Sequence, residues 1–200
     1  MADEFVSFTE TSDVSCSLQM VQETLKSVDL NPQGWKWVIL GTFAALQTAM
    51  VGHLSGTANL GALSVRSRRE FDDWHKLRAQ RPRIECGDSP DEYLAAPRVL
   101  FERLIDESRR TETAGGPIEV TQKQQKTYEQ IHTHFRNNFT HFPPMTWLIE
   151  VGGLPDMICE LLDLIEAIKA DGWAFRHAED GEAEQLGNLI DEIRQTLLTV

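Results

Sequence analysis

The amino-acid sequence predicts an all-α protein, a single-domain helical bundle of six or seven helices. Apolar residues recur at steps of three and four along most of the chain, whereas the period-two alternation of strands is nearly absent. Proline and glycine residues interrupt these periodic stretches at intervals that suit short connections between helices. The chain has 200 residues, of which 41% are hydrophobic, and this is enough for one compact core.

The first two helices are expected at about residues 13–28 and 33–54. Residues 1–12 are polar and are expected to form a flexible N-terminus, so the helical domain spans residues 13–200. The second helix is apolar nearly all round, which predicts a place at the centre of the bundle. Small residues in this helix would allow neighbouring helices to approach closely: Gly41, Ala44, Ala45, Thr48 and Ala49.

Five further helices follow, at about residues 67–79, 89–105, 121–142, 154–170 and 182–198. Ser89 or Asp91 is expected to cap the helix of residues 89–105, and Thr121 the helix of residues 121–142. The helix of residues 121–142 must end before Pro143-Pro144, because a residue that precedes proline is pushed out of the helical region. Asp171-Gly172 separates the last two helices.

The sequence favours a cytoplasmic protein outside the membrane. No Asp, Glu, Lys or Arg lies between Lys36 and Arg66, but the longest strongly apolar part, residues 38–51, is shorter than the roughly 20 residues of a spanning helix. The acidic start of the chain is unlike a secretory signal. Three widely spaced cysteines form no CxxC pair and are interpreted as reduced thiols: Cys16, Cys86 and Cys159.

The charge distribution limits where a nucleic acid would bind. The formal net charge is -12, which excludes an overall basic surface. Residues 61–136 nevertheless carry 14 of the 19 basic side chains, together with 13 acidic ones. Residues 137–200 carry 3 basic and 12 acidic side chains. A basic groove therefore requires that the fold gather side chains of the middle segment.

One motif contains residues suited to catalysis: Arg136-Asn137-Asn138-Phe139-Thr140-His141. The phosphate-binding loop GxxxxGK[ST] and the GxGxxG, HExxH and GxSxG motifs are absent from the sequence. A second arginine followed by histidine, Arg69 to His75, encloses three acidic residues that would repel phosphate. In the first motif amides follow the arginine, and a helix end between Arg136 and His141 would let both face one groove.

Together with its helical context, this motif resembles the R-x4-6-H signature of the HEPN superfamily over about residues 34–170. The resemblance implies a homodimer that binds RNA or nucleotides and cleaves RNA at the dimer cleft with no metal or other cofactor. It assigns the scissile phosphate to Arg136, proton transfer to His141 and a positioning role to Asn137. We expect Asn138 and His134 to contact the substrate. Members that bind without cutting leave catalysis open, and a bacterial defence or toxin–antitoxin role is a family-level expectation.

Structural interpretations of the same residues remain open. Arg136 can pair with Glu129 or with a C-terminal acid, and His141 can cap the helix that it follows. We expect no metal site, because His132, His134 and His141 lack a Cys or Glu at ligand spacing. The aromatic residues near the motif favour core packing over base stacking: Phe135, Phe139, Phe142 and Trp147. Trp35 and Trp37 are expected in the core or at an interface.

Two alternatives remain beyond the motif. Gln47 and His53 lie within the most apolar helix, where a satisfied core hydrogen bond is favoured over a place beside the cleft.

As an alternative function, the chain is a non-catalytic helical interaction protein whose acidic C-terminal helices dock a partner protein that the sequence does not identify. No nuclease activity is then expected.

Overall fold

The computed structural model describes residues 5–80 and 87–200. Within these residues every regular element is helical, and the β pairing consists of one isolated bridge between Leu63 and Leu94. The elements are α1 (Glu10–Leu25), η1 (Pro32–Gly34), α2 (Trp35–Leu54), α3 (Val65–Gln80), α4 (Pro97–Ile105), η3 (Glu107–Arg109), α5 (Gln122–Gln130), η4 (Ile131–Arg136), α6 (Asn137–Thr140), α7 (Leu154–Asp171) and α8 (Glu182–Leu197). The segments α5, η4 and α6 follow one another without a break and form one helical rod. Counted in this way, the described residues form 7 helices, which confirms the predicted all-α bundle.

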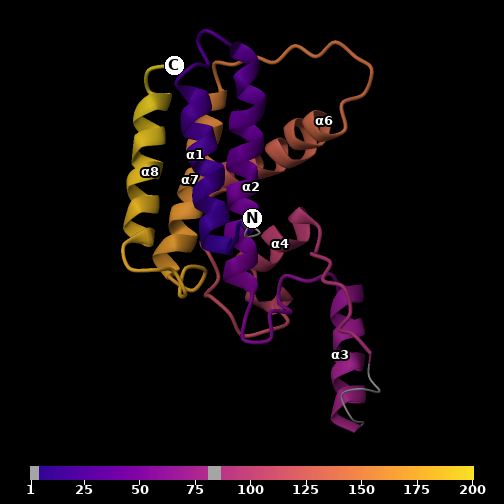
Figure 1. Cartoon of the computed structure of the whole chain (residues 1–200). Helices are drawn as coiled ribbons and strands as arrows, with labels where there is room; N and C mark the ends of the chain where they lie inside the picture. Colours follow the sequence, from indigo (N-terminus) through magenta and orange to yellow (C-terminus); the bar gives the residue numbers. More distant parts are fainter. Residues whose placement is uncertain (1–4, 81–86) are drawn as a thin grey trace.

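The core of the bundle is built around α2, as its composition predicts. This helix packs on α1, α4, α7 and η4, while α8 lies along α1 and α7 on the outside (Figure 1). A Cβ atom added to Gly41 would meet Val21 Cγ2 at 2.7 Å, so this glycine permits the close approach of α1. Pro32–Leu54 is long and apolar enough to cross a membrane by length and composition, but 67% of its most apolar window is buried inside the bundle.

Helix α1 begins at Glu10, three residues before the expected boundary at residue 13. Thr9 and Ser12 form a capping box, in which the Ser12 N–H donates to Thr9 Oγ1 at 3.1 Å and the Thr9 N–H donates to Ser12 Oγ at 2.8 Å. Such a box satisfies two backbone donors that a helix start otherwise leaves unpaired. Of the twelve residues expected to be flexible, residues 10–12 are therefore helical, and residues 1–4 lie outside the described part.

Helix α4 begins at Pro97, so the expected start near Ser89 or Asp91 is wrong. The residues before Pro97 pair with the chain after α2 instead: the Ser64 N–H donates to the Tyr93 carbonyl at 2.8 Å, and the Ala95 N–H donates to Ala62 at 2.9 Å. Proline suits the first turn of a helix, where a backbone N–H has no intrahelical partner. Helix α3 projects from the bundle beside this segment (Figure 1).

Charged side chains hold the loops at the C-terminal end of α2 through hydrogen bonds to their backbone. The Glu112 carboxylate accepts backbone N–H donors from Ala58, Leu60 and Gly61, at 2.6, 2.9 and 2.7 Å. Arg103, only 4% exposed, donates to the carbonyls of Gly61 and Leu63. Arg110 donates to four carbonyls, those of Arg103, Leu104, Gly115 and Gly116. Two of the 14 basic side chains in residues 61–136 are thus committed to loop backbone.

Candidate functional site

The rod formed by α5, η4 and α6 carries four of the five site residues that the sequence predicts, and the fifth, His141, directly follows its last residue. Thr121 caps its start as expected, with Gln124 as the second member of a capping box. The middle of the rod, Ile131–Arg136, is π-helical. Single π-helical turns within α-helices occur frequently at functional sites, and this one includes His132, His134 and Arg136.

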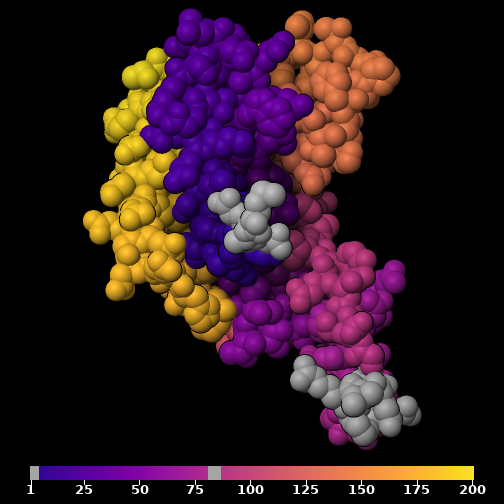
Figure 2. Space-filling model, in the orientation of Figure 1, coloured from indigo at the N-terminus to yellow at the C-terminus, as the bar shows by residue number. Residues whose placement is uncertain are grey.

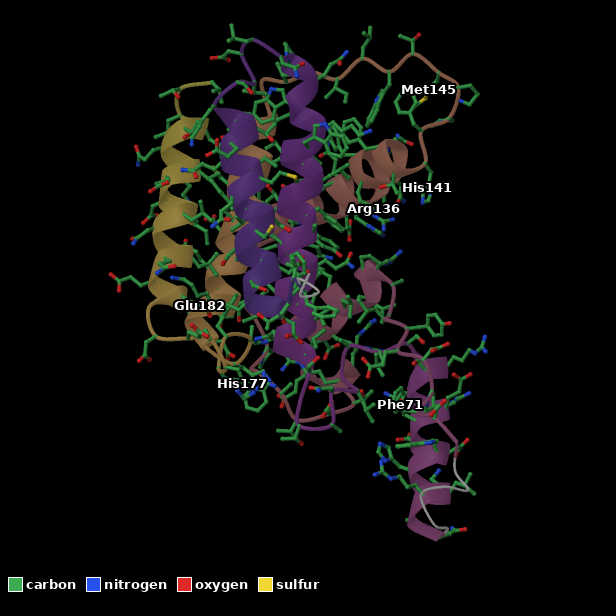
Figure 3. The ribbon with its side chains drawn as sticks, viewed as in Figure 1. Phe71, Arg136, His141, Met145, His177 and Glu182 are labelled. Carbon is green, nitrogen blue, oxygen red and sulfur yellow. The ribbon has the colours of Figure 1, made fainter. Side chains whose placement is uncertain are left out.

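The rod ends at Thr140, between Arg136 and His141 but a full turn beyond the arginine. His141 leaves the helix at φ -120° and ψ 52°, and its N–H still donates to the Asn137 carbonyl at 2.9 Å. Five helical steps rotate a side chain by about 140°, so the helix itself does not bring Arg136 and His141 to one face. Figure 3 shows both residues near the free end of the rod, where the His141 side chain is exposed.

The guanidinium group of Arg136 is half-buried and has no carboxylate partner. Its Nη1 donates to Asn137 Oδ1 at 3.1 Å. Among residues 5–80 and 87–200, no carboxylate oxygen lies within 4.0 Å of the guanidinium nitrogens, so neither Glu129 nor a C-terminal acid neutralises them. By contrast, Lys123 pairs with Glu160 at 2.6 Å. A half-buried cation without a counter-ion is suited to binding an anion.

His132, which the sequence analysis gives no role, lies on the rod one turn before Arg136. Its ring stacks on Phe43, with centroids 5.8 Å apart, and lies 6.1 Å from the Tyr128 ring. Its Nδ1 atom is buried and has no hydrogen-bond partner. Burial lowers the pKa of His132, and the nearby charges of Arg136 and Arg98 lower it further. The spacing of four residues between His132 and Arg136 is the signal that would have identified this pair.

His134 and Asn138 lie on another face of the rod and line a pocket of about 480 Å³. Gln130, Trp147 and Glu150 also line this pocket, which lies between the rod and the extended segment before α7. Neither Arg136, Asn137 nor His141 contributes to its walls. The structure thus brings together the two residues expected to contact substrate, and separates them from the three expected to act on the phosphate.

Three of the four aromatic residues near the motif pack against one another. The Trp147 ring lies 5.7 Å from Phe135 and 5.0 Å from Phe139, centroid to centroid. These contacts hold the extended segment before α7 against the rod, which confirms the expected packing role. Phe142 is the exception, because 54% of its surface is exposed.

The tryptophans of α2 divide in the same way. Trp35 is buried at the start of the helix, and Trp37 is 51% exposed. Lys36 lies over the ring of Trp37 at 4.9 Å, a cation–π contact at the surface. Trp35 thus lies in the core, whereas the exposed Trp37 does not, and a place at an interface stays a prediction for Trp37.

The basic side chains of the middle segment do not gather into one patch in the described residues. Arg66 and Lys76 pair with acidic neighbours on α3, whereas Arg98 and Arg109 share Glu102 on α4. Arg81 and Arg83 lie outside the described residues. Figure 2 shows a concave edge between the orange segment that includes α6 and the magenta residues beneath it. The described residues therefore form no broad basic groove, and only a few cations lie beside the rod.

No cluster of three or more His, Cys, Asp or Glu side chains able to hold a metal ion occurs in the described residues. Cys16 is exposed and Cys159 is half-buried, both as free thiols, while Cys86 lies outside the described part.

The rod and the residue that follows it offer a cation, an imidazole and amide groups, which are hydrogen-bond donors to phosphate oxygens. Comparisons of the chain with protein-family models, curated proteins and solved structures found no match.

Proposed function

We propose that this chain is a HEPN-like RNA-binding protein whose binding surface is centred on Arg136. The observation that carries the proposal is the half-buried residue Arg136, whose guanidinium has an amide oxygen as its partner and, among the described residues, no carboxylate within 4.0 Å. Arginine presents planar, permanently charged donors that match phosphate oxygens. Asn137 orients the guanidinium through its side-chain oxygen.

We further propose that the protein cleaves RNA without a metal ion, as a homodimer that pairs two copies of the motif. Arg136 would stabilise the charge that develops on the phosphate in the transition state. His141 lies just beyond the helix end with an exposed side chain, so it is free to reach a phosphate held at Arg136 and to carry a proton. The second copy would bring a second arginine and a second histidine to the same cleft, as the resemblance implies.

An RNA cleavage assay in the presence of a chelator tests this mechanism. The pure protein should cleave a labelled RNA, and Arg136→Ala and His141→Ala should each abolish cleavage. Arg69→Ala is the matched control, because Arg69 is followed by a histidine at similar spacing but lies on α3 among acidic residues. Cleavage that persists in both site variants would remove the mechanism. Loss of cleavage with retained RNA binding in His141→Ala would support separate binding and proton-transfer roles.

The acidic C-terminal helices favour a second candidate function, the docking of a basic partner protein. The exposed acids Glu184 and Glu192 lie along α8. A single arginine, Arg194, pairs with Asp163 and Glu166 between α7 and α8. This candidate predicts salt-sensitive binding of a basic protein and no nuclease activity. Reversing the charge of Glu184 and Glu192 to lysine should abolish that binding but leave RNA binding at Arg136 unchanged.

A further inference from the structure

The segment that joins the rod to α7 contains an extended stretch, residues 146–150, with an unpaired backbone. Figure 1 shows this segment as an orange trace that runs from the free end of the rod to α7. Within residues 5–80 and 87–200, no backbone–backbone hydrogen bond involves the N–H or C=O groups of residues 146–150, and the isolated β bridge lies elsewhere. An extended segment with free backbone groups is a template on which another strand can pair.

The side chains of this stretch alternate between two faces, as they do in a strand. Trp147 and Ile149 are half-buried and pack against the core and the rod. The residues between and beside them, Thr146, Leu148 and Glu150, are exposed. Leu148 is 90% exposed. The stretch therefore has the period of two that is typical of a strand packed on one face.

This stretch lacks the features that usually protect a free strand edge. Natural proteins blunt such edges with lysine, proline or a bulge, because an unprotected edge associates with another chain. Residues 146–151 contain no Lys, Arg, Pro or Gly, and their one charged residue is Glu150. Their Thr, Trp, Ile and Val residues favour strands. An edge of this kind with an exposed leucine at its centre is suited to a partner strand.

The stretch is complementary to itself in one antiparallel register. When Leu148 of one copy lies opposite Leu148 of another, Trp147 lies opposite Ile149 and Thr146 lies opposite Glu150. Pairs of an aromatic and a β-branched residue stabilise neighbouring strands, whereas like charges that lie opposite each other destabilise them. A register centred on Glu150 would place two carboxylates opposite each other. The Leu148 register avoids this repulsion, and its two-fold symmetry closes the pair as a dimer.

We propose that residues 146–150 of two copies of this chain pair as antiparallel strands and form the interface of a homodimer. This inference deepens the proposed function, which includes a homodimer without assigning its interface, and its role in RNA binding rests on that function. Opposite residues of antiparallel strands point to the same face, so both rods, which contact Trp147, lie on one side of the paired strands. Residues 147–150 also line the pocket that contains His134 and Asn138, so pairing places the second copy at its rim.

Leu148→Lys tests the interface, with Leu30→Lys as its matched control. The two leucines are 90% and 91% exposed, so a lysine at either position leaves the packing of the single chain unchanged. Leu148→Lys alone places two like charges opposite each other on the two-fold axis. A short strand pair buries less than the roughly 1,200 Å² of a standard stable interface, so the dimer should dissociate on dilution.

Analytical ultracentrifugation over a range of protein concentrations measures the dimer dissociation constant. The natural protein and Leu30→Lys should form the same dimer. Leu148→Lys should raise the dissociation constant by at least about tenfold, because it removes the central apolar contact and adds repulsion.

Hydrogen exchange at low and high protein concentration tests the strand pairing itself. Alternate amides of residues 146–150 should exchange more slowly as the dimer forms, because they are then hydrogen-bonded across the interface. This protection should be retained in Leu30→Lys and absent in Leu148→Lys. A dimer that leaves these amides unprotected uses another surface and overturns the inference. Protection that appears only when a different protein is added also overturns it, since the edge then belongs to that partner.

The outcomes separate this interface from the proposed function. If Leu148→Lys dimerises as the natural protein does while RNA binding still depends on Arg136, the interface is wrong and the proposed function stands. If Leu148→Lys dissociates the dimer but the natural protein binds no RNA, the interface stands and the proposed function fails. A natural protein that is monomeric at every concentration and binds no RNA overturns both.

Discussion

The His53 imidazole and the Asp171 carboxylate lie 3.4 Å apart, from Nδ1 to Oδ1, at the end of the bundle. His53 is fully buried, and its Nε2 donates to the Gly116 carbonyl at 2.7 Å. Asp171 accepts the Gly116 N–H at 3.0 Å. These two side chains therefore clamp the loop before α5 to the ends of α2 and α7. The buried histidine of the apolar helix has the core hydrogen bond that the sequence favours.

The buried His53 makes the stability of the fold dependent on pH. Burial lowers the pKa of His53 below its ordinary value of 6.5, so the unfolded chain binds the proton more readily. The contribution of this group is fully present above pH 6.5 and is lost as the pH falls below it. We expect the free energy of unfolding, measured by urea titration, to fall between pH 7.5 and 5.5. His53→Gln should flatten this fall, whereas exposed His177→Gln should not. An equal slope in both variants would contradict this role.

Glu112 is expected to be the most sensitive carboxylate of the loops. Its three backbone hydrogen bonds hold residues 58–61. Because Glu112 is only partly buried, each bond is expected to contribute about 0.5–1.5 kcal/mol, the range of an ordinary hydrogen bond. Glu112→Ala should lower the free energy of unfolding by about 2–4 kcal/mol, with a smaller loss for Glu112→Gln, which keeps one acceptor oxygen. Exposed Glu119→Ala serves as the control in the same thermal unfolding experiment. Equal melting temperatures for the two alanine variants would refute the role of Glu112.

Two helical glycines should respond to alanine with opposite signs. A Cβ atom at Gly41 would meet Val21 Cγ2 at 2.7 Å and the Ser17 carbonyl oxygen at 3.3 Å, so Gly41→Ala forces α1 away and should cost about 1–2 kcal/mol. At Gly187 the nearest atom is the mobile Nζ of Lys169, at 2.8 Å. Gly187→Ala should therefore stabilise α8 by up to about 1 kcal/mol through helix propensity. Melting temperatures that change in the same direction would contradict this assignment of the α1–α2 contact.

RNA binding at Arg136 should depend on salt with a shallow slope. The logarithm of the affinity for single-stranded RNA falls with the logarithm of salt concentration by about 0.7 for each phosphate that is neutralised. Few unpaired cations lie beside the rod, so we expect a slope of about -2. Arg136→Ala should reduce the magnitude of the slope by about 0.7, the value for one phosphate contact. Fluorescence anisotropy between 50 and 300 mM salt measures both values. An unchanged slope in Arg136→Ala would place the bound phosphates elsewhere.

Most helices were predictable from the sequence because their signals are local. Thr121 caps its helix as expected, and the apolar steps from Val14 to Leu25 mark the buried face of α1. The start of α4 was not predictable in the same way. Ser89 and Asp91 are sound capping residues, but the bonds of Tyr93 and Ala95 to residues 62–64 hold this segment extended. Those partners are about thirty residues away in the chain, so no local pattern of residues indicates this pairing.

The sequence by itself determined that this chain is an all-α bundle and that Arg136 opens a motif of polar residues near a helix end. Tertiary structure alone decided what surrounds the motif: His132 lies on the turn that adjoins Arg136 and stacks on Phe43 of α2, while His134 and Asn138 line a separate pocket. Periodicity and capping act over a few residues, and they can be recognised in the sequence. The neighbours of a side chain depend on how helices pack, which the sum of many distant apolar contacts determines.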